Sequence, residues 1–112
     1  MEIVFATKKL EHALATNDRR VRKFGPPAAK VLTRRLAQLQ AAPHLGEFRM
    51  LPGSCHELHG DRAGQLAIEV TKGMRLVFKP TDNPPPTKPD SGLDCDAVVA
   101  ITILEVTDYH GS

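Results

Sequence analysis

Side chains that transfer protons or carry a fixed positive charge gather in two short stretches of this sequence. They are His56, His59, Asp61 and Arg62 in “CHELHGDR”, and Asp108, Tyr109 and His110 at the end of “EVTDYH”. Imidazole suits proton transfer near neutral pH, and guanidinium keeps its charge throughout the physiological range. Together such groups could cleave a phosphodiester bond, which needs a base, an acid and a cation for the charge that develops on the phosphate.

RNA can be cleaved in this way without a metal ion, because its neighbouring 2′-hydroxyl acts as the nucleophile. Arg62 or Arg75 would then supply the fixed positive charge. The alternative is that His56 and His59 are ordinary loop residues and that “DYH” is the polar end of a strand. The residues alone leave both interpretations open.

A metal site is a further alternative, since “HELH” places two imidazoles at positions i and i+3 and Cys55 or Asp108 could add a ligand. In extended structure residues i and i+3 face opposite sides, and neither the spacing nor the number of ligands matches a known zinc signature. We therefore expect no metal ion and no cofactor.

Positive charge is concentrated in the first part of the chain. Residues 1–79 hold 14 of the 15 lysines and arginines against 7 acids, whereas residues 80–112 hold one lysine against 6 acids. Four of the cations fall within five positions: Arg19, Arg20, Arg22 and Lys23. This distribution favours an anionic partner, of which nucleic acid is the commonest, and a plain solvated surface is the alternative.

An RNA-binding module without catalysis is another hypothesis. The chain has no tryptophan, one tyrosine and four scattered phenylalanines, so it shows no aromatic platform on which bases could stack. Such a module would bind electrostatically, through the four cations of residues 19–23 together with Lys30, Arg34 and Arg35.

Two helices are predicted near the start of the chain. Thr7 can cap a helix over residues 8–18, and two prolines suit the first turn of a second helix over residues 26–42. Between them, residues 17–25 interrupt the apolar pattern, and residues 44–54 are expected to form a loop. The predicted core-facing residues of the second helix are Ala28 or Ala29, Leu32, Leu36 and Leu39.

The remaining hydrophobic pattern predicts strands. A β-prone run covers residues 2–6, and alternating runs over 66–70 and 74–78 flank a tight “TKG” turn, which is typical of a hairpin. The run over 97–106 is apolar on both faces and should be central in the sheet. This order of elements predicts an α+β fold with the helices packed on one face of a mainly antiparallel sheet.

The length of 112 residues predicts one domain, with a Pro/Asp-rich surface loop at residues 80–96. No apolar run is long enough to span a bilayer, and the lysines near the N-terminus follow the apolar stretch, which is the wrong order for a secretory signal. We therefore expect a cytoplasmic protein in which Cys55 and Cys95 are free thiols.

The run “LPGSCHELHGDRAGQLAIEVTKGMRLVFKP” followed by “ITILEVTDYH” resembles the HigB-type branch of the RelE/ParE toxin superfamily. The resemblance covers about residues 25–110 and rests on His-x-Leu-x-Gly-Asp-Arg-x-Gly, a hairpin arginine and a terminal Asp-Tyr-His. It implies the RelE-like fold, in which two helices pack on a curved antiparallel sheet. It also implies the toxin of a type II toxin–antitoxin system, which cuts mRNA in the ribosomal A site and is neutralised by a helix-turn-helix antitoxin.

The resemblance assigns roles to individual residues. The catalytic positions that it implies are His56, Asp108, Tyr109 and His110. Arg75 falls where the family places an arginine near the scissile phosphate. This sequence departs from the family at His59, where a lysine is common, and in the length of the loop at 80–96.

The leading hypothesis is a metal-free, ribosome-dependent mRNA endonuclease. In it, Asp108, His110 and His56 share the proton transfers, and Tyr109 positions or stacks on the substrate. Arg75, Arg62 and His59 bind the phosphate, and the basic segment 17–23, with Arg19, Arg20, Arg22 and Lys23, contacts ribosomal RNA together with the second helix. The alternatives are a non-catalytic inhibitor of DNA gyrase like the ParE branch, or a non-toxic relative that only binds its antitoxin.

Overall fold

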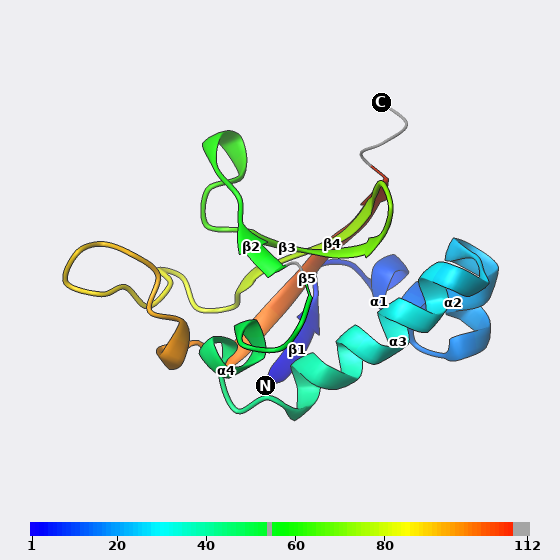
Figure 1. The fold of residues 1–112 in the computed structure, drawn as a ribbon, viewed down its shortest axis with the longest axis horizontal. Coiled ribbons are helices and arrows are strands. Elements are labelled where there is room, and N and C mark those ends of the chain that lie inside the picture. Colours follow the sequence, from blue (N-terminus) through cyan, green and yellow to red (C-terminus); the bar gives the residue numbers. More distant parts are fainter. Residues whose placement is uncertain (54, 109–112) are drawn as a thin grey trace.

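Five strands form one sheet in the order β1-β5-β4-β3-β2 in the computed structural model, which describes residues 1–53 and 55–108 (Figure 1). The strands are β1 (Glu2–Phe5), β2 (Cys55–Glu57), β3 (Leu66–Thr71), β4 (Met74–Pro80) and β5 (Ala100–Asp108). Only the pair of β1 and β5 is parallel, and the other three pairs in this described part of the chain are antiparallel. The predicted α+β class with a mainly antiparallel sheet is confirmed.

The prediction of two N-terminal helices was wrong. The structure has α1 (Lys8–Leu14), α2 (Asn17–Phe24) and α3 (Pro26–Ala41) in this part of the chain. Thr7 caps α1 as predicted, but the Thr16 hydroxyl then accepts a hydrogen bond from the Arg19 backbone N–H (3.2 Å) and begins a new helix. Gly25, with a φ of +88°, ends α2 directly before α3. The segment expected to interrupt the pattern is therefore itself a helix.

A short fourth helix, α4 (Leu45–Arg49), lies where a loop was predicted. Its N-terminus is capped by a histidine, since Nδ1 of His44 accepts a hydrogen bond from the Glu47 backbone N–H at 3.2 Å. Histidine is an uncommon residue at this position, which explains why the sequence pattern did not reveal the helix. No helix in residues 1–53 or 55–108 is both long and apolar enough to cross a membrane.

The core lies between the helices and one face of the sheet. As predicted, Ala28, Ala29, Leu32 and Leu39 of α3 are buried, and Leu36 is partly buried. Their partners on the sheet alternate along the strands: Leu66, Ile68 and Val70, then Leu76 and Phe78, then Ile101 and Ile103. Figure 1 shows the helices on the core-facing side of the sheet and the turn between β2 and β3 on the opposite side.

The predicted loop at 80–96 connects β4 to β5, although Pro80 itself still pairs with Ile101 as the last residue of β4. The loop forms its own bridge between Thr87 and Leu93, followed by a 3₁₀ turn, η2 (Cys95–Ala97). Because this turn occupies the first part of the apolar run predicted as a strand, β5 begins at Ala100 rather than at residue 97.

Candidate functional site

The face of the sheet turned away from the helices, which we call the outer face, carries several of the predicted site residues. Strand register aligns His56, Ala67, Val77 and Glu105 in one row across β2, β3, β4 and β5. The next row contains Glu69, Arg75 and Thr107. Because side chains alternate along a strand, these rows lie opposite the core-facing residues.

Arg62 reaches the same face from a different element. It lies in a 3₁₀ turn, η1 (Gly60–Arg62), within the connection between β2 and β3. Its Nη2 donates a hydrogen bond to Oε2 of Glu105 at 2.9 Å, across 43 residues of sequence. Strand register and this ion pair therefore bring His56, Arg62 and Arg75 to one side of the sheet.

The second histidine of “HELH” lies at the edge of this site. His59 directly precedes η1 and is exposed, as is His56 in β2. Neither residue is enclosed by the protein, and strand register places His56 on the outer face. Among residues 1–53 and 55–108, no group of three or more His, Cys, Asp or Glu side chains is arranged to hold a metal ion.

The terminal triplet is only partly described. Asp108 ends β5, where its main chain pairs with Met74, next to the pair of Arg75 and Thr107. This register brings the end of β5 beside the row that contains Arg75. Tyr109 and His110 lie outside the described residues.

The predicted RNA-binding cations divide into two groups. Arg19, Arg22 and Lys23 line a groove of about 250 Å³ between α1 and α2, which Lys9 and His12 complete. Arg20 instead holds helices together, since its Nε donates to Oγ1 of Thr33 (2.9 Å) and its Nη1 to the Leu14 carbonyl (2.6 Å). Arg35, which had been grouped with the surface cations, is only 8% exposed. Its Nη1 donates to the Pro52 carbonyl and to Gln38.

A smaller groove joins the basic helices to the sheet. It has a volume of about 210 Å³ and is lined by Lys9 and Lys23 on one side and by Leu104, Glu105 and Val106 of β5 on the other. The cationic surface of α1 and α2 is therefore adjacent to the strand that carries the terminal triplet.

Sequence reasoning missed Glu105, Lys9 and His12. Glu105 begins the quoted “EVTDYH” and is the one charged residue in the apolar run before the triplet, a signal that could have identified it. Lys9 and His12 were missed because the sequence analysis did not predict α2 as a separate helix. The break at residue 16 lets α2 form a groove with α1, and these two residues line it.

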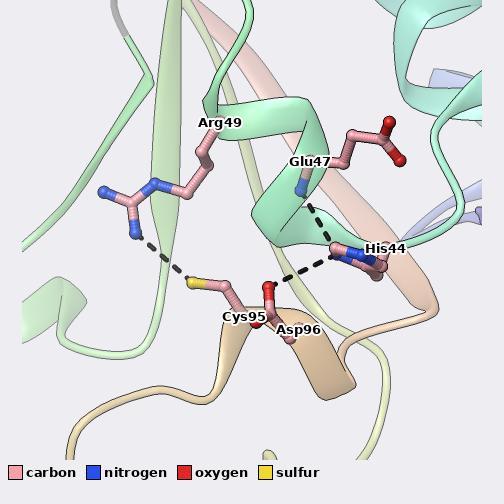
Figure 2. Close-up of polar contacts among 5 residues, drawn as sticks. All are labelled: His44, Glu47, Arg49, Cys95 and Asp96. Carbon is pink, nitrogen blue, oxygen red and sulfur yellow. Dashed lines mark hydrogen bonds and ion pairs between the residues drawn. The ribbon is translucent and has the colours of Figure 1, made fainter.

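A second polar cluster lies away from the outer face, where α4 contacts η2 (Figure 2). Asp96 Oδ1 lies 3.5 Å from the capping Nδ1 of His44, and Arg49 Nη1 donates to Sγ of Cys95 (3.4 Å). Arg49 Nη1 also donates to Oε2 of Glu57 in β2 (3.2 Å). The hydrogen bond from Arg49 to Cys95 attaches the end of the long loop to α4, whereas Nδ1 of His44 accepts from Glu47 and has no proton to donate to Asp96.

Both cysteines are free thiols. Cys55 pairs with Ile68 and packs against the core. Burial raises the pKa of the Cys55 thiol to about 11, although the nearby Arg49 charge acts in the opposite direction. Cys55 is therefore a neutral, structural thiol at neutral pH rather than a nucleophile.

No family model matches the chain, and no curated protein matches it in sequence. Among solved structures, it is similar to a YoeB/ParE toxin from Agrobacterium tumefaciens, with a TM-score of 0.59 and 13% sequence identity. The match covers 98% of this chain and 99% of that one. At such low identity the likeness concerns the fold alone, and this chain has the fold of that toxin over almost its whole length.

Proposed function

We propose that this chain is the toxin of a type II toxin–antitoxin system, of the HigB type, and that it cleaves mRNA on the ribosome by acid/base chemistry. The observation that carries the proposal is the gathering of His56, Arg62 and Arg75 on the outer face, next to the end of β5. These are the proton-transfer groups and cations that cleavage through a 2′-hydroxyl requires. The fold shared with a YoeB/ParE toxin supports the proposal.

In this mechanism His56, Asp108 and His110 share two proton transfers. One group takes the proton of the 2′-hydroxyl, and another gives a proton to the departing 5′-oxygen. Arg75 and Arg62 bind the non-bridging phosphate oxygens, and His59 binds the phosphate beside them. Tyr109 positions or stacks on the substrate.

The partners follow from the same proposal. The groove between α1 and α2, with Lys9, Arg19, Arg22 and Lys23, would contact ribosomal RNA while the outer face meets the mRNA in the A site. A cognate helix-turn-helix antitoxin would neutralise the toxin.

The test is controlled expression followed by mapping of mRNA ends. We expect the wild-type chain to arrest growth and to cut translated mRNA, and His110→Ala or His56→Ala to reduce cleavage by about 10²–10⁴-fold while the protein stays folded. Glu57→Ala is the matched control, since Glu57 neighbours His56 on β2 but pairs with Arg49 rather than facing the outer side. A folded His110→Ala variant that remains equally toxic would contradict the mechanism.

The second candidate function is non-catalytic inhibition of DNA gyrase. It is favoured by the similar structure, whose description names ParE as well as YoeB. A gyrase inhibitor would leave transcripts intact and induce DNA damage, so the same map of mRNA ends separates the two functions.

A further inference from the structure

We propose that Glu105 is a positioning residue, which holds the guanidinium of Arg62 over the outer face so that it can bind the scissile phosphate. The proposal rests on the proposed function, because it assigns to Glu105 a role in the same cleavage site. Glu105 would not touch the substrate itself and would act only through Arg62.

The contact is direct and joins distant parts of the chain. Nη2 of Arg62 lies 2.9 Å from Oε2 of Glu105, and the two side chains are 35% and 44% exposed. At that exposure an ion pair contributes little to the free energy of unfolding. Its main consequence is therefore geometric, since it restricts where the guanidinium can lie.

The route of the Arg62 side chain follows from strand register. Arg62 starts in the connection between β2 and β3, whereas Glu105 lies on β5, so the side chain must pass over β3 and β4. The residues beneath that path, Ala67 and Val77, are both 0% exposed although they face away from the helices. A long cationic side chain on this path would cover that apolar surface with its methylene groups.

The local backbone does little to fix Arg62. The turn η1 has only three residues and no side-chain cap, and its first residue, Gly60, and the nearby Gly64 have positive φ angles of 64° and 90°. An arginine side chain is long and has many rotamers, and this freedom must be lost before it can bind an oxyanion in a fixed geometry. The carboxylate of Glu105 removes much of that freedom before the substrate arrives.

The guanidinium keeps donors for a ligand while Glu105 holds it. Arginine has five N–H groups, and Glu105 accepts a hydrogen bond from one nitrogen, Nη2. The second N–H of Nη2 and both N–H groups of Nη1 therefore remain for a phosphate that binds on the outer face beside Arg62, one row from Arg75.

The proposal is tested by a double-mutant cycle on mRNA cleavage by translating ribosomes, with purified wild type, Glu105→Ala, Arg62→Ala and the double variant. We expect Glu105→Ala to lower kcat about tenfold with a smaller change in KM, since a phosphate-binding group acts most strongly in the transition state. The double variant should be no slower than Arg62→Ala alone, because Glu105 acts only through Arg62.

Two variants serve as matched controls. Glu105→Gln keeps an oxygen that can accept from Arg62 and should retain kcat within about threefold of the wild type. Glu57→Ala breaks the ion pair with Arg49, which has similar exposure (29% and 45%) but lies on the other side of the sheet, and it should leave kcat unchanged. A direct readout is the Nε–Hε NMR signal of Arg62, which should be sharp in the wild type and broadened in Glu105→Ala.

Three results would overturn the proposal. One is a double variant that is slower than Arg62→Ala by the whole factor seen for Glu105→Ala. Another is faster cleavage by Glu105→Ala, which would show that the carboxylate competes with phosphate. The third is an unchanged Arg62 signal in Glu105→Ala. Absence of cleavage by the wild type would instead overturn the proposed function, and with it any part of Glu105 in cleavage.

Discussion

Nη1 of Arg35 donates a hydrogen bond to the carbonyl oxygen of Pro52 at 2.8 Å and thereby joins α3 to the loop that enters β2. The same nitrogen also donates to Oε1 of Gln38. Arg35 therefore belongs to the interior of the protein, and its contact with Pro52 fixes the start of the strand that carries His56. The guanidinium of Arg35 occupies the space that a Cβ at the next residue, Gly53, would need.

The first prediction is that Gly53→Ala destabilises the fold. A Cβ at Gly53 would lie 1.8 Å from Nη2 of Arg35, and the φ of +137° is already unfavourable for any residue with a side chain. Moving the guanidinium aside would break its hydrogen bonds to Pro52 and Gln38, so we expect a loss of about 2–4 kcal/mol in the free energy of unfolding. Urea denaturation measures this loss in the free energy of unfolding.

Gly64→Ala separates the two contributions to this loss. Gly64 also has a positive φ (+90°), but a Cβ there would meet nothing within 4 Å, so only backbone strain remains, about 1–2 kcal/mol. In an Arg35→Met background, Gly53→Ala should cost less than it does in the wild type, because the overlap with the guanidinium is removed and only backbone strain remains. An equal cost for both glycine substitutions in the wild type would show that the Arg35 contact is unimportant.

The helices and strands whose hydrophobic period was regular could be predicted from the sequence. Leu32 and Leu39 of α3, and Leu66, Ile68, Leu76 and Phe78 of the hairpin, are buried as the pattern indicated. The sequence of each such element shows which of its residues are buried, because one face of the element must pack against the core.

The errors in the sequence-based prediction arose where contacts between distant parts of the chain determine the structure. The pattern placed Arg35 among surface cations, since its burial depends on Pro52, 17 residues away. Residues 17–25 appeared to be a break because their helix is almost entirely polar and has no buried residue. The pairing of Arg62 with Glu105 spans 43 residues and depends on the register of β4 with β5, which a bulge after Val77 shifts. The register of two strands that lie far apart in the chain could not be predicted from this single sequence.

The second prediction concerns alkaline pH. Burial raises the pKa of Cys55 from an ordinary value of 9.0 to about 11, so the folded state holds this proton more tightly than the unfolded state does. The stabilisation is fully present below pH 9 and is lost as pH rises through 11, with a total of about 2–3 kcal/mol. Wild-type stability should therefore fall more steeply between pH 9 and 11 than that of Cys55→Ala, as measured by urea denaturation. Parallel curves for the two proteins would contradict the pKa assignment.

The third prediction is that the groove between α1 and α2 binds RNA through its charge. Replacing Arg19, Arg22 and Lys23 by glutamine should weaken binding to ribosomal RNA and reduce the slope of log K against log salt by about 2, since each lost phosphate contact contributes roughly 0.7. The measurement is a titration of RNA binding at several salt concentrations.

Other exposed cations provide the control for this charge change. Lys72 in the hairpin turn, Lys79 in β4 and Lys88 in the long loop are exposed and lie outside the groove. Glutamine at these three positions removes the same charge and should leave the slope within about 0.5 of the wild type. Equal effects of the two triple variants would show that net charge, rather than the groove, governs binding.

The fourth prediction tests how the long loop is attached to α4. A Cβ at Gly46 would lie 2.0 Å from Oδ1 of Asp96, so Gly46→Ala should displace Asp96 and weaken the contact shown in Figure 2. We expect a loss of about 1–2 kcal/mol in the free energy of unfolding. In an Asp96→Ala background the main obstacle is absent and only Nδ1 of His44, at 3.2 Å, must give way slightly, whereas alanine is favoured over glycine within a helix by about 1 kcal/mol. There the same substitution should stabilise the protein, so the sign of its effect reverses between the two backgrounds. Denaturation of the four proteins measures this reversal, and destabilisation in both backgrounds would show that Asp96 does not pack against Gly46.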